Sequence, residues 1–235
     1  MQDFGAAFGL AASLLFNGDP VLMEIIGRSL AVSLGAVACA CLIGLPLGAL
    51  VGFSRFPGRR AVIVALNSLM GLPPVVIGLL VYMLLSRAGP LGFLGLLYTP
   101  TAMVIAQAVL VTPLVAALAR QTVESLARDY DETFRSLVVP WRTRLATLLW
   151  DGRSALVTVG LAGFGRAIAE VGAVIVVGGN IDHVTRVMTT AIALETSKGD
   201  LALALALGFV LMLVALGVNG AVMALRLRAE EAGHG

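Results

Sequence analysis

The stretch that decides the fold is SLAVSLGAVACACLIGLPLGALVGFS, residues 29–54, which lies between Arg28 and Arg55 and contains no charged side chain. Its 26 residues exceed the roughly 20 that an α-helix needs to cross the hydrocarbon core of a bilayer. Four further stretches are as long and nearly as free of charge, at residues 61–86, 88–119, 154–181 and 201–225. The sequence therefore predicts five transmembrane helices.

The composition agrees with a protein whose solvent is the lipid bilayer. Hydrophobic residues make up 59% of the chain and charged residues only 13%, about half the charged share of a soluble domain. The formal net charge of +2 is small and spread along the chain. This excludes a nucleic-acid-binding protein, which needs a clustered basic surface.

The distribution of basic residues predicts the orientation of the spans. With five helices, eleven of the 16 Lys and Arg residues fall on one side of the membrane, and short cytoplasmic loops retain such residues. We therefore expect an external N-terminus and a cytoplasmic C-terminus. The expected organisation is an interfacial amphipathic segment at residues 1–20, a transmembrane domain at residues 21–228 and a cytoplasmic tail at residues 229–235.

The longest polar segment, at about residues 120–153, is expected on the cytoplasmic side. The third span should continue past Pro113 to Leu126, and Asp129 with Glu132 has the spacing of a capping box that starts a short helix. Pro140 suits the start of another helix, over residues 141–150. Two interpretations stay open: a projection that a soluble partner grips, or amphipathic helices that rest on the bilayer surface.

Two charged residues interrupt the fourth span. Arg166 and Glu170 are four positions apart, so they can meet on one face of a continuous helix. Charges within a bilayer are costly and need partners or water. The pair either faces a transport pathway, where Arg166 attracts an anion and Glu170 weakens that attraction, or forms a closed ion pair that fixes the helix.

Small residues and prolines mark further positions within the spans. Gly44, Gly48 and Gly52 give two overlapping GxxxG spacings, which allow close helix packing or, alternatively, line the pathway. Pro46 and the pair Pro73 and Pro74 predict kinks.

The connection at residues 178–200 is expected on the outer side. Its apolar run at residues 187–194 either dips back into the bilayer as a short helix or lies on the outer surface, and Asn180 and His183 belong to its polar part. A lone loop histidine favours a solvated side chain over a metal ligand or pH switch.

The run Asp131-Glu132-Thr133-Phe134-Arg135-Ser136-Leu137, before an Arg-rich helix and a further span, resembles the EAA loop in permease subunits of bacterial ABC importers. Thr133 and Phe134 stand where that motif has alanines, and Val138 where it has glycine. The resemblance implies a coupling helix that docks on a cytoplasmic ATPase. It implies docking through Asp129, Asp131, Glu132, Thr133, Phe134, Arg135, Ser136 and Val138.

Other motifs resemble the oxyanion branch of the same family, and tungstate permeases most. They are residues 71–78, GLPPVVIG; 89–92, GPLG; 98–101, YTPT; 105–107, IAQ; 164–173, FGRAIAEVGA; and 178–181, GGNI, together with 189–192, TTAI. The resemblance implies an all-α integral membrane protein with five transmembrane helices of the type I ABC importer permease (MetI-like) fold, preceded by the interfacial helix. The implied cargo is tungstate, with molybdate or sulfate as alternatives.

The resemblance also implies partners and a location. The permease would form a homodimer with two ATPase subunits and an external substrate-binding protein, in a bacterial or archaeal cytoplasmic membrane. The chain has no GxxxxGK motif followed by Ser or Thr, so we expect ATP and Mg to bind only the ATPase partner and no cofactor or enzymatic activity here. The proposed pathway or gate residues are Arg166, Glu170, Pro73, Pro74 and Asn180.

Two other classes of protein are weaker alternatives. A secondary anion transporter usually has internal repeats, and none is convincing here. A membrane-embedded hydrolase needs a nucleophile and a base within reach of each other, and His183 is poorly placed for that.

Overall fold

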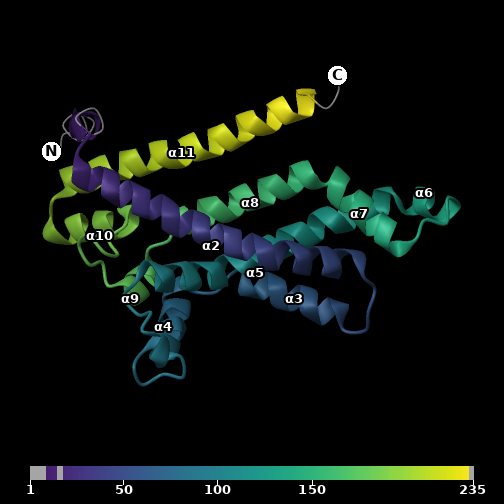
Figure 1. Ribbon diagram of the computed structural model, residues 1–235, viewed down its shortest axis with the longest axis horizontal. Coiled ribbons are helices and arrows are strands. Elements are labelled where there is room, and N and C mark those ends of the chain that lie inside the picture. Colours follow the sequence, from purple (N-terminus) through teal and green to yellow (C-terminus); the bar gives the residue numbers. More distant parts are fainter. Residues whose placement is uncertain (1–8, 15–17, 233–235) are drawn as a thin grey trace. The chain divides into compact units, whose positions relative to one another are not determined.

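The structure is a computed structural model that describes residues 9–14 and 18–232, and every regular element in these residues is helical (Figure 1). Three helices are long and apolar enough to cross a membrane: α2 (Pro20–Phe53), α5 (Pro100–Asp129) and the Leu201–Arg226 part of α11 (Leu201–Ala232). The remaining elements are α3 (Arg59–Leu69), α4 (Pro74–Leu85), η1 (Gly92–Leu94), α6 (Asp131–Ser136), α7 (Trp141–Asp151), α8 (Arg153–Ile168), α9 (Gly172–Gly178) and α10 (Met188–Lys198).

Two of the five expected spans are bent pairs of helices rather than continuous helices. α3 and α4 meet at 98°, and α8 and α9 at 60°, so the described residues contain five spans only if each pair counts as one. The first bend is at Pro73 and Pro74. Proline disfavours helical backbone in the residue before it, and Pro74 is well suited to the first position of α4. The predicted kink is confirmed here, whereas α2 continues unbroken through Pro46.

The described chain divides into two compact units. Unit 1 takes the described residues within Met1–Ser33, Pro74–Ala106 and Ile168–Gly235, and unit 2 takes Leu34–Pro73 and Gln107–Ala167. The boundaries between the units fall within α2, α5 and α8, so each unit combines segments that are far apart in the sequence.

Unit 1 contains two packing groups. α4 packs against α9, where Gly78 leaves so little room that an added Cβ would lie 2.8 Å from the Cα of Ala173. α10 packs against α11, and Met188 and Val210 are fully buried in a cluster that also takes in Leu22 of α2. The expected apolar run at residues 187–194 therefore forms a helix whose first turn is buried in protein.

Unit 2 is held by a close contact between α2 and α5. A Cβ at Gly48 would lie 2.8 Å from the Cβ of Ala119 and 2.9 Å from the backbone nitrogen of Arg120. A Cβ at Gly44 or Gly52 would lie 3.0 Å or 2.8 Å from the nearest atom of α5. Helix packing, rather than an open pathway, is thus the use of these three glycines.

Part of the N-terminal prediction lies outside the described residues. Residues 1–8 and 15–17 are not described, whereas residues 9–14 are helical and Ala11 is buried in the α10–α11 cluster of unit 1. Residues 233–235 of the expected tail also lie outside the described chain.

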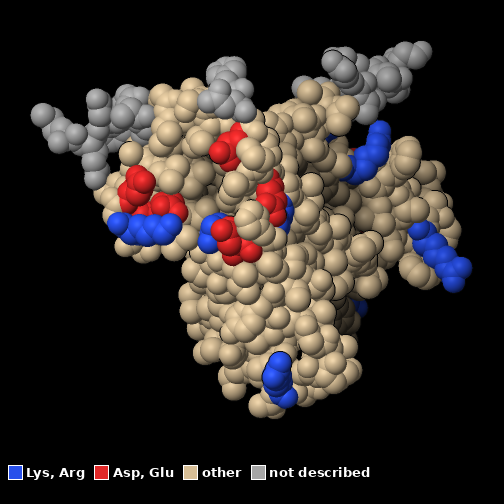
Figure 2. Space-filling model, turned by 60° about the vertical axis from the view of Figure 1, so that its left-hand side comes forward, with Lys and Arg blue, Asp and Glu red and all other residues tan. Residues whose placement is uncertain are grey.

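Charge is unevenly distributed over the surface. On the face drawn in Figure 2, the acidic side chains gather in one area together with some basic ones, a few further basic side chains lie singly elsewhere, and the wide tan surface between them carries no charge. Large apolar side chains such as Leu42, Met83 and Phe93 are exposed. In water such a surface would be unfavourable, so the chain is an integral membrane protein.

Candidate functional site

The segment at residues 130–152 connects α5 to α8 and contains the predicted short helix. α5 continues through Pro113 to Asp129, as expected, and α6 begins only two residues later. The predicted capping box is wrong. The cap position is Tyr130 in helical conformation, and no side chain caps it, because a capping oxygen reaches the first turn only from an extended backbone.

The end of α6 is a Schellman turn with valine in the position that glycine usually takes. The amide of Val139 donates to the carbonyl of Phe134 at 3.1 Å, and the amide of Val138 donates to that of Arg135 at 3.3 Å. Val138 has φ 48°. The motif ends a helix by a left-handed residue, so Val138 has the backbone conformation that glycine usually takes at this position of a Schellman turn.

Phe134 anchors α6 to the rest of unit 2. Its side chain is 7% exposed and belongs to a cluster with Ala49, Val123 and Leu148. The ring also stacks on Tyr130 with 5.5 Å between centroids. Phe134, which stands where the EAA motif has alanine, is therefore a packing residue that connects α6 to α2, α5 and α7.

Arg144 of α7 fixes α6 from the other side. Its Nε donates to the carbonyl of Val139 at 2.7 Å, one Nη donates to that of Phe134 at 3.2 Å, and the guanidinium lies 5.8 Å from the Phe134 ring. A cation beside the last carbonyls of a helix also complements its dipole. The Asp151 carboxylate accepts a hydrogen bond from Tyr130 and raises the pKa of that phenol.

The turn that ends α6, and most of α6 itself, is exposed. Leu137 is 70% and Val138 82% exposed, and both lie just beyond the anchored turn. Leu137 was not among the predicted docking residues, whereas Val138 was. Of the remaining predicted ones, Asp131 and Arg135 form an ion pair at 2.8 Å. Asp129, Glu132, Thr133, Arg135 and Ser136 are exposed, and Asp131 is half-buried.

The sequence interpretation missed an ionic cluster beside this segment. Glu124 of α5 lies 2.6 Å from Arg120 and 3.1 Å from Arg59, and Arg128 is 4.0 Å away. Arg59 also donates to the carbonyl of Val51 at 2.9 Å, near the end of α2. The spacing of Arg120, Glu124 and Arg128 at four-residue intervals was the available signal.

Glu170 is not on the same helix as Arg166, because α8 ends at Ile168. Glu170 is buried in the break before α9, where its carboxylate accepts a hydrogen bond from the Ala173 amide at 3.2 Å. Its carbonyl accepts one from Thr189 of α10 at 2.9 Å. The four-residue spacing therefore does not place Arg166 and Glu170 on one face of a continuous helix. In its observed place, the Glu170 carboxylate lies at the start of α9, where a negative charge is favourable. Arg166 is half-buried.

The remaining predicted pathway residues lie at helix boundaries. Pro73 precedes α4, and Pro74 is its first residue. Asn180 follows the C-terminus of α9 with φ 51°. Asparagine tolerates this left-handed backbone better than most residues.

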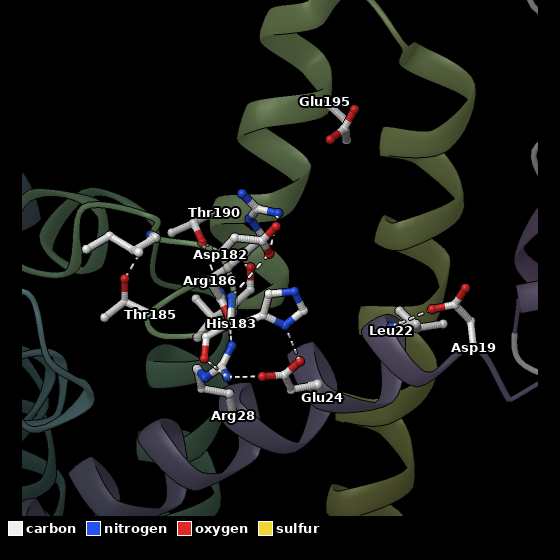
Figure 3. Close-up of polar contacts among 12 residues, drawn as sticks. Asp19, Leu22, Glu24, Arg28, Asp182, His183, Thr185, Arg186, Thr190 and Glu195 are labelled. Carbon is white, nitrogen blue, oxygen red and sulfur yellow. Dashed lines mark hydrogen bonds and ion pairs between the residues drawn. The ribbon is translucent and has the colours of Figure 1, made fainter.

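A second polar cluster lies in unit 1, where the loop after α9 meets the start of α2 (Figure 3). His183 Nδ1 is 2.8 Å from the carboxylate of Glu24, which also pairs with Arg28. Arg28 in turn donates to the carbonyls of His183 at 2.8 Å and Arg186 at 3.2 Å. Hydrogen bonding to Glu24 and the charge of Asp182 raise the pKa of His183. The sequence alone favoured a solvated His183 side chain and did not indicate its contact with Glu24.

Residues 44–230 match the family model described as the inner membrane component of binding-protein-dependent transport systems. The chain is 40% identical to the tungstate uptake system permease protein TupB of Peptoclostridium acidaminophilum, over 96% of this chain and 99% of that one. It is 38% identical to the TupB of Campylobacter jejuni, over 90% and 89% of the two chains.

A third relative is a probable anion ABC transporter permease protein of Haloferax volcanii, which is 42% identical over 84% of this chain and 88% of that one. The family model spans most of the chain, and the permease subunits that it describes have no ATPase activity of their own. The chain belongs to the family of inner membrane components of binding-protein-dependent transport systems, the permease subunits of ABC importers.

Proposed function

We propose that this permease carries tungstate, as an oxyanion importer driven by a separate ATPase. The observation that carries the proposal is the similarity, over nearly the whole length of both chains, to two permeases named for tungstate uptake. Molybdate and sulfate are tetrahedral dianions of the same kind and are the alternative cargoes. A competition assay with the assembled importer separates them: if tungstate is the cargo, an equal concentration of molybdate or sulfate should leave tungstate uptake nearly unchanged, whereas strong inhibition by either would favour that anion.

The proposed assembly is a homodimer of this chain with two ATPase subunits and an external substrate-binding protein, in the cytoplasmic membrane of a bacterium or archaeon. In that assembly the N-terminus is outside, and the segment at residues 130–152 is on the cytoplasmic side. The excess of arginine near this segment supports that orientation. ATP and Mg bind the ATPase subunits, and this chain holds no cofactor.

The proposed docking element is α6 together with the turn that ends it, which includes Leu137 and Val138. The exposed pair Leu137 and Val138 supports this role, because apolar side chains on a rigidly held turn are suited to the centre of a protein interface. Phe134 and Arg144 hold the turn to α2, α5 and α7, so a movement of the ATPase would be transmitted to the membrane helices.

A single substitution tests the docking role. Leu137→Asp places a charge on the exposed turn without touching the core, and we expect about tenfold less ATPase to co-purify, equivalent to about 1.4 kcal/mol. Thr143→Asp on α7 is a matched control, because Thr143 is also exposed but lies outside α6 and the turn that ends it. Equal retention of the ATPase by wild type and Leu137→Asp would exclude α6 as the docking element.

Arg166, Glu170, Pro73, Pro74 and Asn180 are the proposed residues of the transport pathway or its gate. For Arg166 the proposal predicts that Arg166→Gln weakens tungstate uptake while ATPase docking persists. For Glu170 the position at the start of α9 gives a second expectation, that Glu170→Gln changes gating through the α8–α9 break. Uptake that is unchanged in both variants would remove the pair from the pathway.

A further inference from the structure

A recess of about 520 Å³ lies in unit 2 beside α6. Five arginines line it, contributed by the connection after α2 and by α3, α5, α6 and α7: Arg55, Arg59, Arg128, Arg135 and Arg144. Only two carboxylates, Glu124 and Asp131, line it as well. The lining therefore carries three more positive than negative charges.

The ion pairs already present do not remove this excess. Asp131 is engaged by Arg135 at 2.8 Å. Glu124 is shared by Arg120 at 2.6 Å, Arg59 at 3.1 Å and Arg128 at 4.0 Å. Arg144 hydrogen-bonds only to backbone carbonyls within the described residues. Arg55 has no hydrogen bond or ion pair in the part of the chain that the structure describes. Uncompensated guanidinium groups around one concavity repel each other, and a bound anion would relieve that repulsion.

The chemistry of the lining selects the kind of anion. Guanidinium groups present paired N–H donors that match the oxygens of phosphate and similar tetrahedral oxyanions. The recess is also of the size that small ligands occupy in proteins. Its wall includes Phe53 and Ser54, where the apolar run of α2 ends. Basic pockets at the ends of transmembrane helices suit phospholipid headgroups.

We propose that this recess binds a tetrahedral phosphate-type oxyanion, supplied either by the headgroup of an anionic phospholipid or by a free oxyanion in solution. The anion would contact Arg55 and Arg128 and would bridge the end of α2 to α6. Since α6 is the proposed docking helix, occupancy would also stabilise the docking geometry. That last consequence rests on the proposed function, whereas the binding itself does not.

The test uses the full-length protein and needs no ATPase, so it stands apart from the test of docking. The double variant Arg55→Gln, Arg128→Gln is compared with wild type and with the control Arg60→Gln. Arg60 is exposed and adjoins Arg59 in sequence but does not line the recess. Because Arg55 has no described contact and Arg128 is 76% exposed, the double variant should unfold at the wild-type temperature.

Two measurements distinguish the sources of the anion. Calorimetric titration with inorganic phosphate in phosphatidylcholine nanodiscs reports the free oxyanion, and native mass spectrometry reports retention of phosphatidylglycerol over phosphatidylcholine. We expect at least one signal in wild type, about tenfold weaker in the double variant and unchanged in Arg60→Gln. Neither signal in wild type, or an equal loss in Arg60→Gln, would overturn the proposal.

Discussion

Val138 occupies a backbone conformation that is unfavourable for its side chain. It has φ 48° and is 82% exposed, so its isopropyl group gains almost no burial in return for the strain. Left-handed backbone costs a residue with a Cβ about 1–2 kcal/mol, and branching at Cβ adds to the crowding. The Schellman turn that ends α6 is nevertheless formed, because Phe134 and Arg144 hold both of its sides.

We predict that Val138→Gly stabilises the protein by about 0.5–1 kcal/mol, the relief of strain less the greater entropy of glycine in the unfolded chain. Unfolding in detergent with increasing denaturant measures this. Leu137→Gly is the control, because Leu137 has φ −88° and relieves no strain, so it should destabilise. If both variants lower the stability equally, the left-handed turn is not a source of strain.

The contact between His183 and Glu24 should depend on pH. Glu24 and Asp182 raise the pKa of His183 above its ordinary value of 6.5, against smaller opposing effects of burial and of Arg28. A group whose pKa is raised by folding contributes stability that is fully present below its unfolded pKa and is lost as the pH rises through its folded pKa. The contact is therefore strongest below about pH 6.5, as long as Glu24 is ionised.

The measurement is an NMR titration of the His183 ring in wild type and in Glu24→Gln. We predict a lower pKa for His183 in the variant, because the main cause of the shift is gone. An identical titration in both proteins would mean that the two side chains are apart in solution.

Several of these residue contacts have no counterpart in the sequence pattern. The arginine-rich helix at residues 141–150 was predicted, but nothing in its pattern says that Arg144, rather than Arg142, reaches the carbonyls of α6. Such pairings depend on how three helices meet. The spacing of residues along one helix does not contain that information.

At the scale of elements, the glycine face of α2 was predictable because its cause is local. Three glycines at four-residue intervals align on one side of a helix. Because glycine has no side chain, a second helix can pack closely against that side. The structure confirms that α5 occupies this side.

We predict that Gly48→Ala destabilises the protein by about 1–3 kcal/mol, the usual cost of inserting a methyl group into a packed contact. The added Cβ would clash with the Ala116 carbonyl and lie 2.8 Å from the Cβ of Ala119. Gly217→Ala on α11 is the control, since no atom lies within 4 Å of its added Cβ. A Gly48→Ala protein as stable as this control would contradict the close α2–α5 contact.

The bends were only partly predictable. The charge-free length of residues 61–86 indicates a span but not its direction, and the prolines give the place of the bend without its angle of 98°. The α8–α9 break has no proline. Glu170 lies in that break and accepts a hydrogen bond from the first turn of α9, so the spacing of Arg166 and Glu170 pointed to a continuous helix that does not exist.

At the scale of the whole molecule, the sequence identifies the class of protein because the bilayer imposes it. A chain with 13% charged residues and five apolar runs has no soluble alternative, and the family match over residues 44–230 gives the class its function. The sequence lacks the energy source, the binding protein and the second permease copy, so the cargo and assembly follow only from similarity to other permeases.

The most direct test of the account is uptake of tungstate into proteoliposomes that contain this permease, its ATPase and its binding protein. The account predicts uptake that requires ATP on the side of the ATPase and stops when either partner is omitted. Tungstate uptake by the permease alone, driven by an ion gradient, would contradict it and would indicate a secondary transporter.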